Sequence, residues 1–150
     1  MTRGYACIAL DNPKNGLNVG SVMRACGAFS VDLIIVAGPR FKTLKRWPTD
    51  TMKAWKHIPL IEVDDVFDAL PHDCVPIAVD LLEGATALPR YTHPERAMYI
   101  FGAEDATLGK RITDRCRDKI VIPTAHCLNL AAAANVILYD RLAKRGRDGP

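Results

Sequence analysis

Short apolar runs of strand length, separated by stretches with helical spacing, constrain the fold of this chain more than any other feature. The apolar runs lie at residues 5–10, 31–38, 57–63, 75–82, 97–104 and 119–124. Most of them are nearly continuous rather than alternating, and strands of that kind are buried on both faces of a sheet. The runs therefore predict a sheet that is covered on both faces.

The stretches between these runs have apolar side chains at helical spacing. They lie at residues 19–29, 64–70, 107–117 and 129–145. Asn18, and the pair Asp64 and Asp65, stand where side chains cap the first two helices. Strands that alternate with helices indicate an α/β fold with a mainly parallel sheet flanked by helices. Since such sheets bind ligands beyond the carboxyl ends of their strands, a site is expected among the residues that follow each strand.

The composition bounds the class of protein. A length of 150 residues suits one domain, residues 1–150, and the net charge of +3 permits an acidic partner such as nucleic acid without requiring one. The apolar stretches are too short to span a membrane. The five cysteines are odd in number and lack metal-ligand spacing, so we expect free thiols, a cytoplasmic protein and no metal.

Three segments that follow strands combine glycine, asparagine, proline and small residues. They are DNPKNGLNVGSVMRACGAF at residues 11–29, GAEDATLG at 102–109 and PTAHCLNL at 123–130. Loops of this composition present bare backbone amides and carbonyls to a ligand. The three segments are therefore the candidate site.

The side chains of the first two segments each allow two interpretations. Asn18 caps a helix or helps to hold an anion. Arg24, inside an apolar run, needs either a carboxylate of this chain or an external phosphate. Glu104 either pairs with Arg24 or caps the following helix, and Asp105 is solvated or caps. The residues alone leave these alternatives open.

The third segment leads into a helix of small residues, Ala131 to Ala134, which suits very close packing. Asn129 stands at the start of that helix. His126 and Cys127 are adjacent in the chain, so they do not form a nucleophile–base pair with each other. We expect Cys127 to be a small packing residue rather than a catalytic nucleophile.

In this order, the three segments resemble the motifs of the SPOUT superfamily, specifically the SpoU-type RNA ribose 2′-O-methyltransferases. NVGSVMR looks like the first motif, IFGAEDATLG the second and IPTAHCLNLAAAANVILYD the third, and together they run from residue 18 to 140. The chain departs from the family pattern at two positions. Cys127 stands where many members have serine, and the glycine of the second motif is displaced to Gly109.

The resemblance implies a trefoil knot in the carboxyl-terminal part, a homodimer, and S-adenosylmethionine (AdoMet) bound by three loops. The implied cofactor-binding residues are Val79, Asp80, Leu81, Phe101, Gly102, Glu104, Ile122, Pro123, Cys127 and Leu128. The implied catalytic residues are Arg24, Asn18 and Asn129. Because arginine stays protonated in proteins, we expect Arg24 to act as an electrostatic clamp on phosphate and alkoxide rather than as a base.

The implied reaction is methyl transfer to a ribose 2′-hydroxyl of RNA. We expect no added RNA-binding domain beside the three motifs, and minimal members of the family resemble the enzymes that methylate the wobble ribose of tRNA. We therefore expect tRNA rather than DNA or a membrane as partner. The segment FKTLKRWPTDTMKAWKH at residues 41–57 mixes basic and aromatic residues, which suits RNA contact, or else is a solvated loop with its tryptophans inward.

Three alternatives stay open at this point. The first is that the chain methylates ribosomal RNA. The second is that it is a catalytically silent RNA-binding or assembly factor on the same fold. A nucleotide-binding enzyme on a Rossmann-like fold is disfavoured, because the chain lacks a Gly-x-Gly-x-x-Gly segment that opens a helix after a strand.

Overall fold

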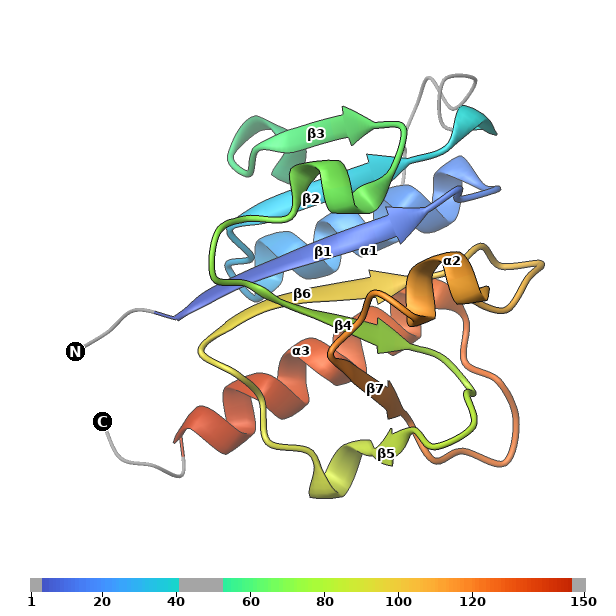
Figure 1. Cartoon of the computed structure of the whole chain (residues 1–150). Helices are drawn as coiled ribbons and strands as arrows, with labels where there is room; N and C mark the ends of the chain where they lie inside the picture. Colours follow the sequence, from blue (N-terminus) through green and yellow to red (C-terminus); the bar gives the residue numbers. More distant parts are fainter. Residues whose placement is uncertain (1–3, 41–52, 147–150) are drawn as a thin grey trace.

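The computed structural model describes residues 4–40 and 53–146, and these residues form one seven-stranded sheet (Figure 1). The strands are β1 (Tyr5–Asp11), β2 (Leu33–Ala37), β3 (Leu60–Val63), β4 (Val75–Val79), β5 (Thr86–Ala87), β6 (Arg96–Phe101) and β7 (Asp118–Val121). Their order is β3-β2-β1-β6-β4-β7-β5, and every pairing is parallel. The predicted α/β class with a parallel sheet is confirmed. A single domain over residues 1–150 stays a prediction.

Helices cover both faces of the sheet, as the continuous apolar runs predict. The helices are α1 (Gly16–Ala28), α2 (Lys110–Thr113) and α3 (Leu130–Gly146), with 3-10 turns η2 (Ala54–Lys56), η3 (Val66–Ala69) and η4 (Leu88–Arg90). Helices α1 and α3 pack together on one face, and α2 and η3 lie on the other (Figure 1).

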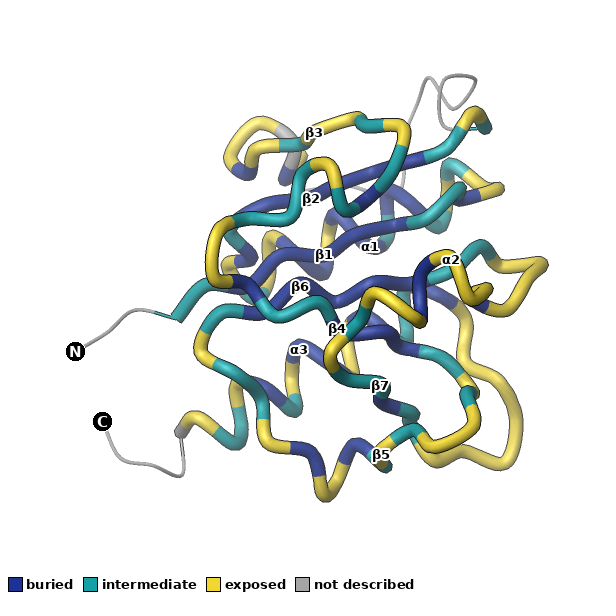
Figure 2. Tube along the Cα trace, in the orientation of Figure 1, coloured by how far each residue is buried: buried dark blue, intermediate teal, exposed yellow. Residues whose placement is uncertain are grey.

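The two hydrophobic cores divide the side chains of each central strand. In β1, Ile8 and Leu10 belong to the core under α1 and α3, whereas Cys7 and Ala9 belong to the core under α2. This division follows from the two-residue period of a strand. Figure 2 shows the central strands as the most buried part of the chain and the connecting segments as largely exposed.

Two of the predicted helices are shorter than expected. The segment at 107–117 is helical only at Lys110–Thr113, because the amide of Leu108 is bonded to a carboxylate and the amide of Arg117 joins the strand region through the Pro76 carbonyl. The segment at 64–70 is a 3-10 turn, capped by Asp65, whose carboxylate accepts from the Phe67 amide at 3.0 Å. The short strand β5 was not predicted.

The first helix begins earlier than its apolar pattern indicates. Its cap is Asn15, whose side-chain oxygen accepts from the Leu17 amide at 2.8 Å, so the prediction that Asn18 is the cap is wrong. The last helix begins as predicted, because Asn129 Oδ1 accepts from the Ala132 amide at 2.7 Å.

Helices within residues 4–40 and 53–146 are all too short or too polar to cross a membrane. The basic and aromatic segment singled out in the sequence lies mostly at residues 41–52, outside the described residues. The sheet therefore provides the frame on which the candidate site has to be built.

Candidate functional site

A cavity of about 910 Å³ lies beyond the carboxyl ends of β4, β6 and β7. These three strands are neighbours in the sheet, in the order β6-β4-β7, so the loops that follow them meet. The walls come from residues 79–81, 101–107 and 121–128, with Leu130 and Ala133 of α3 behind them. This is the edge at which parallel α/β sheets bind ligands.

The ten residues that sequence reasoning assigned to cofactor binding all line this cavity. They are Val79, Asp80, Leu81, Phe101, Gly102, Glu104, Ile122, Pro123, Cys127 and Leu128. The three residues assigned to catalysis, Arg24, Asn18 and Asn129, are not among its walls. The structure thus brings together three segments spread over residues 79–128, and it leaves the assigned catalytic groups outside the walls of the cavity.

Asp80 connects two of the walls. Its Oδ1 accepts from the Leu81 amide at 2.7 Å, and its Oδ2 accepts from the Leu108 amide at 2.8 Å. A Cβ atom at Gly102 would lie 3.2 Å from the Leu108 side chain and 3.3 Å from the Ala106 carbonyl, so a larger residue there requires a small shift of these neighbours. The shape of the cavity therefore depends on a carboxylate and a glycine that hold the same loop.

Glu104 joins the first motif to the second. Its Oε2 accepts from the Lys14 amide at 2.8 Å, and its Oε1 accepts from Asn18 Nδ2 at 3.2 Å. Both expected roles of Glu104, a partner for Arg24 and a helix cap, are therefore wrong. Asn18 instead lies in the first turn of α1 with its amide directed at the loop that walls the cavity.

Asp105 makes the ion pairs of the same loop. The Arg40 guanidinium donates to both of its oxygens, at 3.0 and 3.1 Å, and to the Asn12 carbonyl at 2.7 Å. Lys14 Nζ lies 3.8 Å from the carboxylate. The bond from Arg40 lowers the pKa of Asp105 below its ordinary value. Sequence reasoning left Asp105 as solvated or capping and missed Arg40, since nothing in the linear sequence relates positions 65 residues apart.

Arg24 is exposed, although its apolar surroundings in the sequence had indicated a buried cation. Its chain neighbours Met23 and Ala25 point into the core, which turns Arg24 outward on α1. No carboxylate within residues 4–40 and 53–146 forms an ion pair with it. The interpretation as an internal salt bridge is therefore unsupported, and the cation is accessible to an external anion.

The third loop is exposed throughout residues 123–129. Cys127 is exposed and lines the cavity, so the prediction that it is a packing residue is wrong. Two large apolar side chains at the cavity, Leu81 and Leu128, are 75% and 40% exposed. Apolar side chains beside bare loop amides suit a ligand with a flat apolar ring and polar edges.

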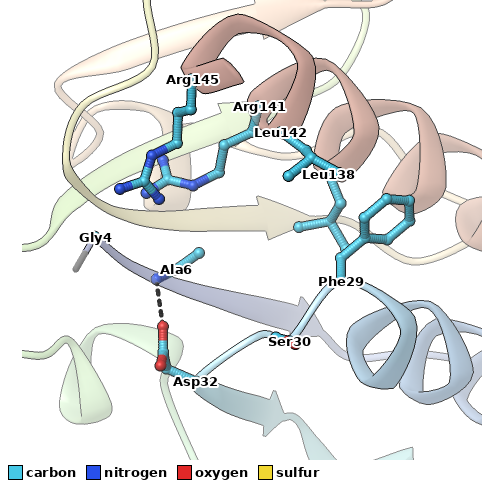
Figure 3. A pocket seen from close by; sticks show the side chains of 9 residues that line it. All are labelled: Gly4, Ala6, Phe29, Ser30, Asp32, Leu138, Arg141, Leu142 and Arg145. Carbon is cyan, nitrogen blue, oxygen red and sulfur yellow. Dashed lines mark hydrogen bonds between the residues drawn. The ribbon is translucent and has the colours of Figure 1, made fainter. Parts of the chain in front are cut away.

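A second cavity, of about 200 Å³, lies by the amino end of β1 (Figure 3). Arg141 and Arg145 extend into it from α3, but both guanidinium groups are already paired with the chain. Arg141 donates to the Pro94 and Glu95 carbonyls, and Arg145 to the Glu95 carboxylate. None of the residues predicted for a site lines this cavity, and the larger cavity is the better candidate.

Comparison with known proteins identifies the family of the chain. The model of the SpoU rRNA Methylase family matches residues 5–139. A Staphylococcus aureus protein named for the TrmH family of tRNA/rRNA methyltransferases is 26% identical over 145 residues, which cover 92% of this chain and 58% of that protein. A 23S rRNA (guanosine-2′-O-)-methyltransferase of Acinetobacter baylyi is 25% identical, with 92% and 59% covered. The chain thus spans less than two thirds of the length of these relatives.

Solved structures show the same fold at low sequence identity. A structure that addresses the 2-OH methylation of C/U34 on tRNA has a TM-score of 0.84 and 22% identity, with 97% of this chain and 99% of that chain covered. The SpoU methyltransferase AviRb of Streptomyces viridochromogenes, in complex with the cofactor AdoMet, has a TM-score of 0.79 and 22% identity, with 97% and 59% covered.

Proposed function

This chain belongs to the SpoU rRNA methylase family, and on that premise we propose that it is an AdoMet-dependent RNA methyltransferase that modifies a ribose 2′-hydroxyl of tRNA. The observation that carries the proposal is the meeting of all ten sequence-assigned cofactor residues around one cavity. Asn18, from the remaining motif, is linked to that cavity through its bond to Glu104.

The cavity fits AdoMet by its chemistry. Leu81 and Leu128 offer exposed apolar surface for an adenine ring, and the loops at 101–107 and 121–128 offer backbone groups for its polar edges. AdoMet supplies a methyl group that is already activated on a sulfonium. The contribution left to the chain is therefore to hold the methyl group and the attacking oxygen in line. Such positioning by itself lowers the activation free energy of the transfer strongly.

Arg24 is the residue that we assign to the attacking ribose. Its guanidinium is exposed and stays protonated, so it stabilises the charge that develops on the 2′-oxygen and binds the adjoining phosphate. The proton leaves to phosphate or water. Asn18 is held by Glu104 beside the donor loop. Asn129 uses its Oδ1 as a helix cap, which leaves its amide Nδ2 to orient donor or ribose.

Transfer RNA is favoured over ribosomal RNA by one comparison. The protein linked to C/U34 methylation on tRNA is matched over 99% of its length with a TM-score of 0.84. The Acinetobacter baylyi relative, named for 23S rRNA, keeps ribosomal RNA as the second candidate. With either substrate, the proposed location is the cytoplasm.

We further propose that the chain works as a homodimer and that its carboxyl-terminal part is knotted, as the family resemblance implies. Exposed apolar side chains support the dimer: Val136, Tyr139 and Leu142 follow one face of α3, and Leu17 is exposed on the adjacent α1. Apolar side chains gathered on packed helices suit a self-complementary interface. Sedimentation of Tyr139→Glu and of the wild-type protein tests this proposal. The wild-type protein is expected to sediment as a dimer and the variant as a monomer. A wild-type protein that sediments as a monomer would contradict the dimer.

The test of the function is transfer of tritium from methyl-labelled AdoMet to unmodified tRNA, followed by nucleoside analysis. A labelled 2′-O-methyl nucleoside is the expected result. Ribosomal RNA is tested in parallel, and label on ribosomal RNA alone would change the assigned substrate from tRNA to ribosomal RNA. Label on a base would show that the enzyme methylates a base atom rather than the ribose 2′-oxygen. Measured AdoMet binding without product on either RNA would favour the silent RNA-binding factor.

A further inference from the structure

The loop at residues 103–107 is a cavity wall with little support from the core. All five residues line the cavity, and none of them is buried. The backbone bond from the Ala106 amide to the Ala103 carbonyl is internal to the loop. Among the residues that the structure describes, its hydrogen bonds with the rest of the chain are those of the Glu104 and Asp105 side chains. A segment held in this way opens more easily than one anchored by apolar burial.

Arg40 forms two of these four hydrogen bonds, both of them with Asp105. Its guanidinium meets the Asp105 carboxylate with two bonds, at 3.0 and 3.1 Å, in the fork geometry that gives arginine pairs their directional strength. A lysine reaches the same carboxylate only at 3.8 Å. Arg40 therefore fixes both the position and the orientation of the Asp105 carboxylate, whereas the ammonium group of a lysine would fix only its position.

Arg40 is itself held on a firm base at the ends of β1 and β2. Its guanidinium donates to the Asn12 carbonyl at 2.7 Å, and the Asn12 amide donates to the Ala37 carbonyl at 2.6 Å. Gly38 has φ +105°, and a side chain there would come within 2.7 Å of Asn12. The turn that carries Arg40 is thus packed directly on the first-motif loop.

We propose that Arg40 is a positioning residue for the methyl-donor site: it clasps Asp105, fixes the 103–107 wall of the cavity, and so sets the affinity for AdoMet. The inference rests on the proposed function, because it assigns the cavity to AdoMet. The clasp connects the loops after β1, β2 and β6, so the donor site is tied to the loop that precedes Asn18 and Arg24.

The clasp acts on the loop rather than on the stability of the whole fold. Both partners are partly exposed, with side chains 34% and 42% accessible, and exposed ion pairs contribute little to global stability. Removal of Arg40 is therefore expected to loosen one wall while the sheet and its two cores stay intact. This separates its expected effect from that of a residue that merely helps the chain to fold.

The test compares Arg40→Ala with Arg117→Ala by calorimetric titration of AdoMet. Arg117 is the matched control, since it forms a similar two-bond pair with Asp118 at the amino end of β7, away from the cavity. Arg40→Ala is expected to weaken AdoMet binding by roughly ten-fold. The melting temperature is expected to stay within about 2 °C of the wild-type value, and so is that of Arg117→Ala.

Steady-state kinetics and the salt dependence of AdoMet binding distinguish a positioning role from a purely structural one. We expect Arg40→Ala to raise KM for AdoMet and to leave kcat at saturating AdoMet within about two-fold. The AdoMet affinity of the wild-type protein should fall with added salt, and that of Arg40→Ala should not, because the exposed pair is screened. Arg40→Lys should lie between the two, and Arg40→Asp combined with Asp105→Arg should recover part of the loss.

Unchanged AdoMet affinity in Arg40→Ala, or a loss equal to that of Arg117→Ala, would overturn the inference. A lower kcat/KM for RNA with normal AdoMet affinity would also overturn it and assign Arg40 to the substrate instead. Both results leave the proposed function standing. A wild-type protein that binds no AdoMet would overturn the proposed function itself, and the clasp with it.

Discussion

Two polar clusters of this molecule use similar groups in opposite ways. The first, the cavity cluster, lies at the larger cavity and consists of Asn18, Arg40, Glu104 and Asp105, joined across three loops. The second, which we term the His93 network, consists of His93, Tyr99, Asp140, Arg141 and Lys144. The side chain of Asp105 is 42% exposed, whereas that of His93 is 2% exposed.

The His93 network satisfies its polar groups inside the protein. His93 lies 2.6 Å from the Tyr99 hydroxyl through Nδ1 and 2.7 Å from Asp140 Oδ2 through Nε2. Lys144 Nζ lies 2.7 Å from the same carboxylate, and Arg141 donates to the Tyr99 hydroxyl at 3.2 Å. Buried polar groups need such partners, and their bonds here fix α3 to the segment that leads into β6.

The difference indicates what each cluster is for. In the His93 network every bond is directed at another part of the chain, and its loss leaves buried polar groups without partners. In the cavity cluster the bonds hold only one side of a loop, and the other side faces a space large enough for a ligand. We therefore expect substitutions in the two places to separate function from stability, and the following experiments test that separation.

The largest effect is expected at Arg24. Arg24→Ala should reduce methyl transfer at least ~100-fold, because it removes the charge that stabilises the attacking oxygen. Its AdoMet affinity should stay within about two-fold of the wild-type value, since Arg24 is not among the cavity walls. Transfer assays and calorimetry measure the two quantities, and Arg90→Ala, another exposed arginine, serves as control. Equal loss of transfer and binding would contradict the assigned role.

The next effect is on stability. His93→Leu should lower the free energy of unfolding by about 2–3 kcal/mol, because it removes one buried partner each from the Tyr99 hydroxyl and the Asp140 carboxylate. Denaturant unfolding measures the change. His57→Leu, at an exposed histidine, should change stability by less than about 0.5 kcal/mol. A similar cost at both positions would remove the distinction between the clusters.

A smaller effect is expected from pH. Burial lowers the pKa of His93 below its ordinary value of 6.5, although Asp140 opposes the shift. Below pH 6.5 the unfolded chain therefore binds a proton that the folded protein does not, and stability falls as the pH decreases. This loss of stability should end below the lowered pKa that His93 has in the folded protein. Unfolding between about pH 8 and pH 5 measures this slope, and His93→Leu should flatten it.

The smallest effect is expected at Cys127. It is exposed in the cavity, while Cys7, Cys26 and Cys74 are buried. AdoMet should slow its alkylation by iodoacetamide by about five-fold, since a bound ligand covers the thiol. Mass spectrometry of the labelled peptides gives the rates. Cys116, half-buried and with its pKa raised to about 11 by burial, is the internal control and should be insensitive to AdoMet. Equal protection of both thiols would point to a global effect.

Sequence reasoning predicted the elements and the loops better than it predicted the roles of single polar residues. It placed the strands and the last helix, because apolar period and length are local properties of the chain. It offered a helix cap as one of two interpretations of Asn18, whereas Asn15 is the cap, since several asparagines stand at the same helix start. It took Arg24 for a buried cation, because an apolar run does not tell which face of the helix a residue lies on.

The amino-acid sequence by itself determined the α/β class, the three motif loops and the family, since each depends on residue types at short spacing. Only the tertiary structure decided which polar groups meet. Glu104 reaches the Lys14 amide 90 residues away, and Arg40 reaches Asp105 65 residues away. The physical reason is the parallel order of the strands: it brings the ends of distant segments to one edge, and the pairing of charges at that edge depends on distance in space, not on distance along the chain.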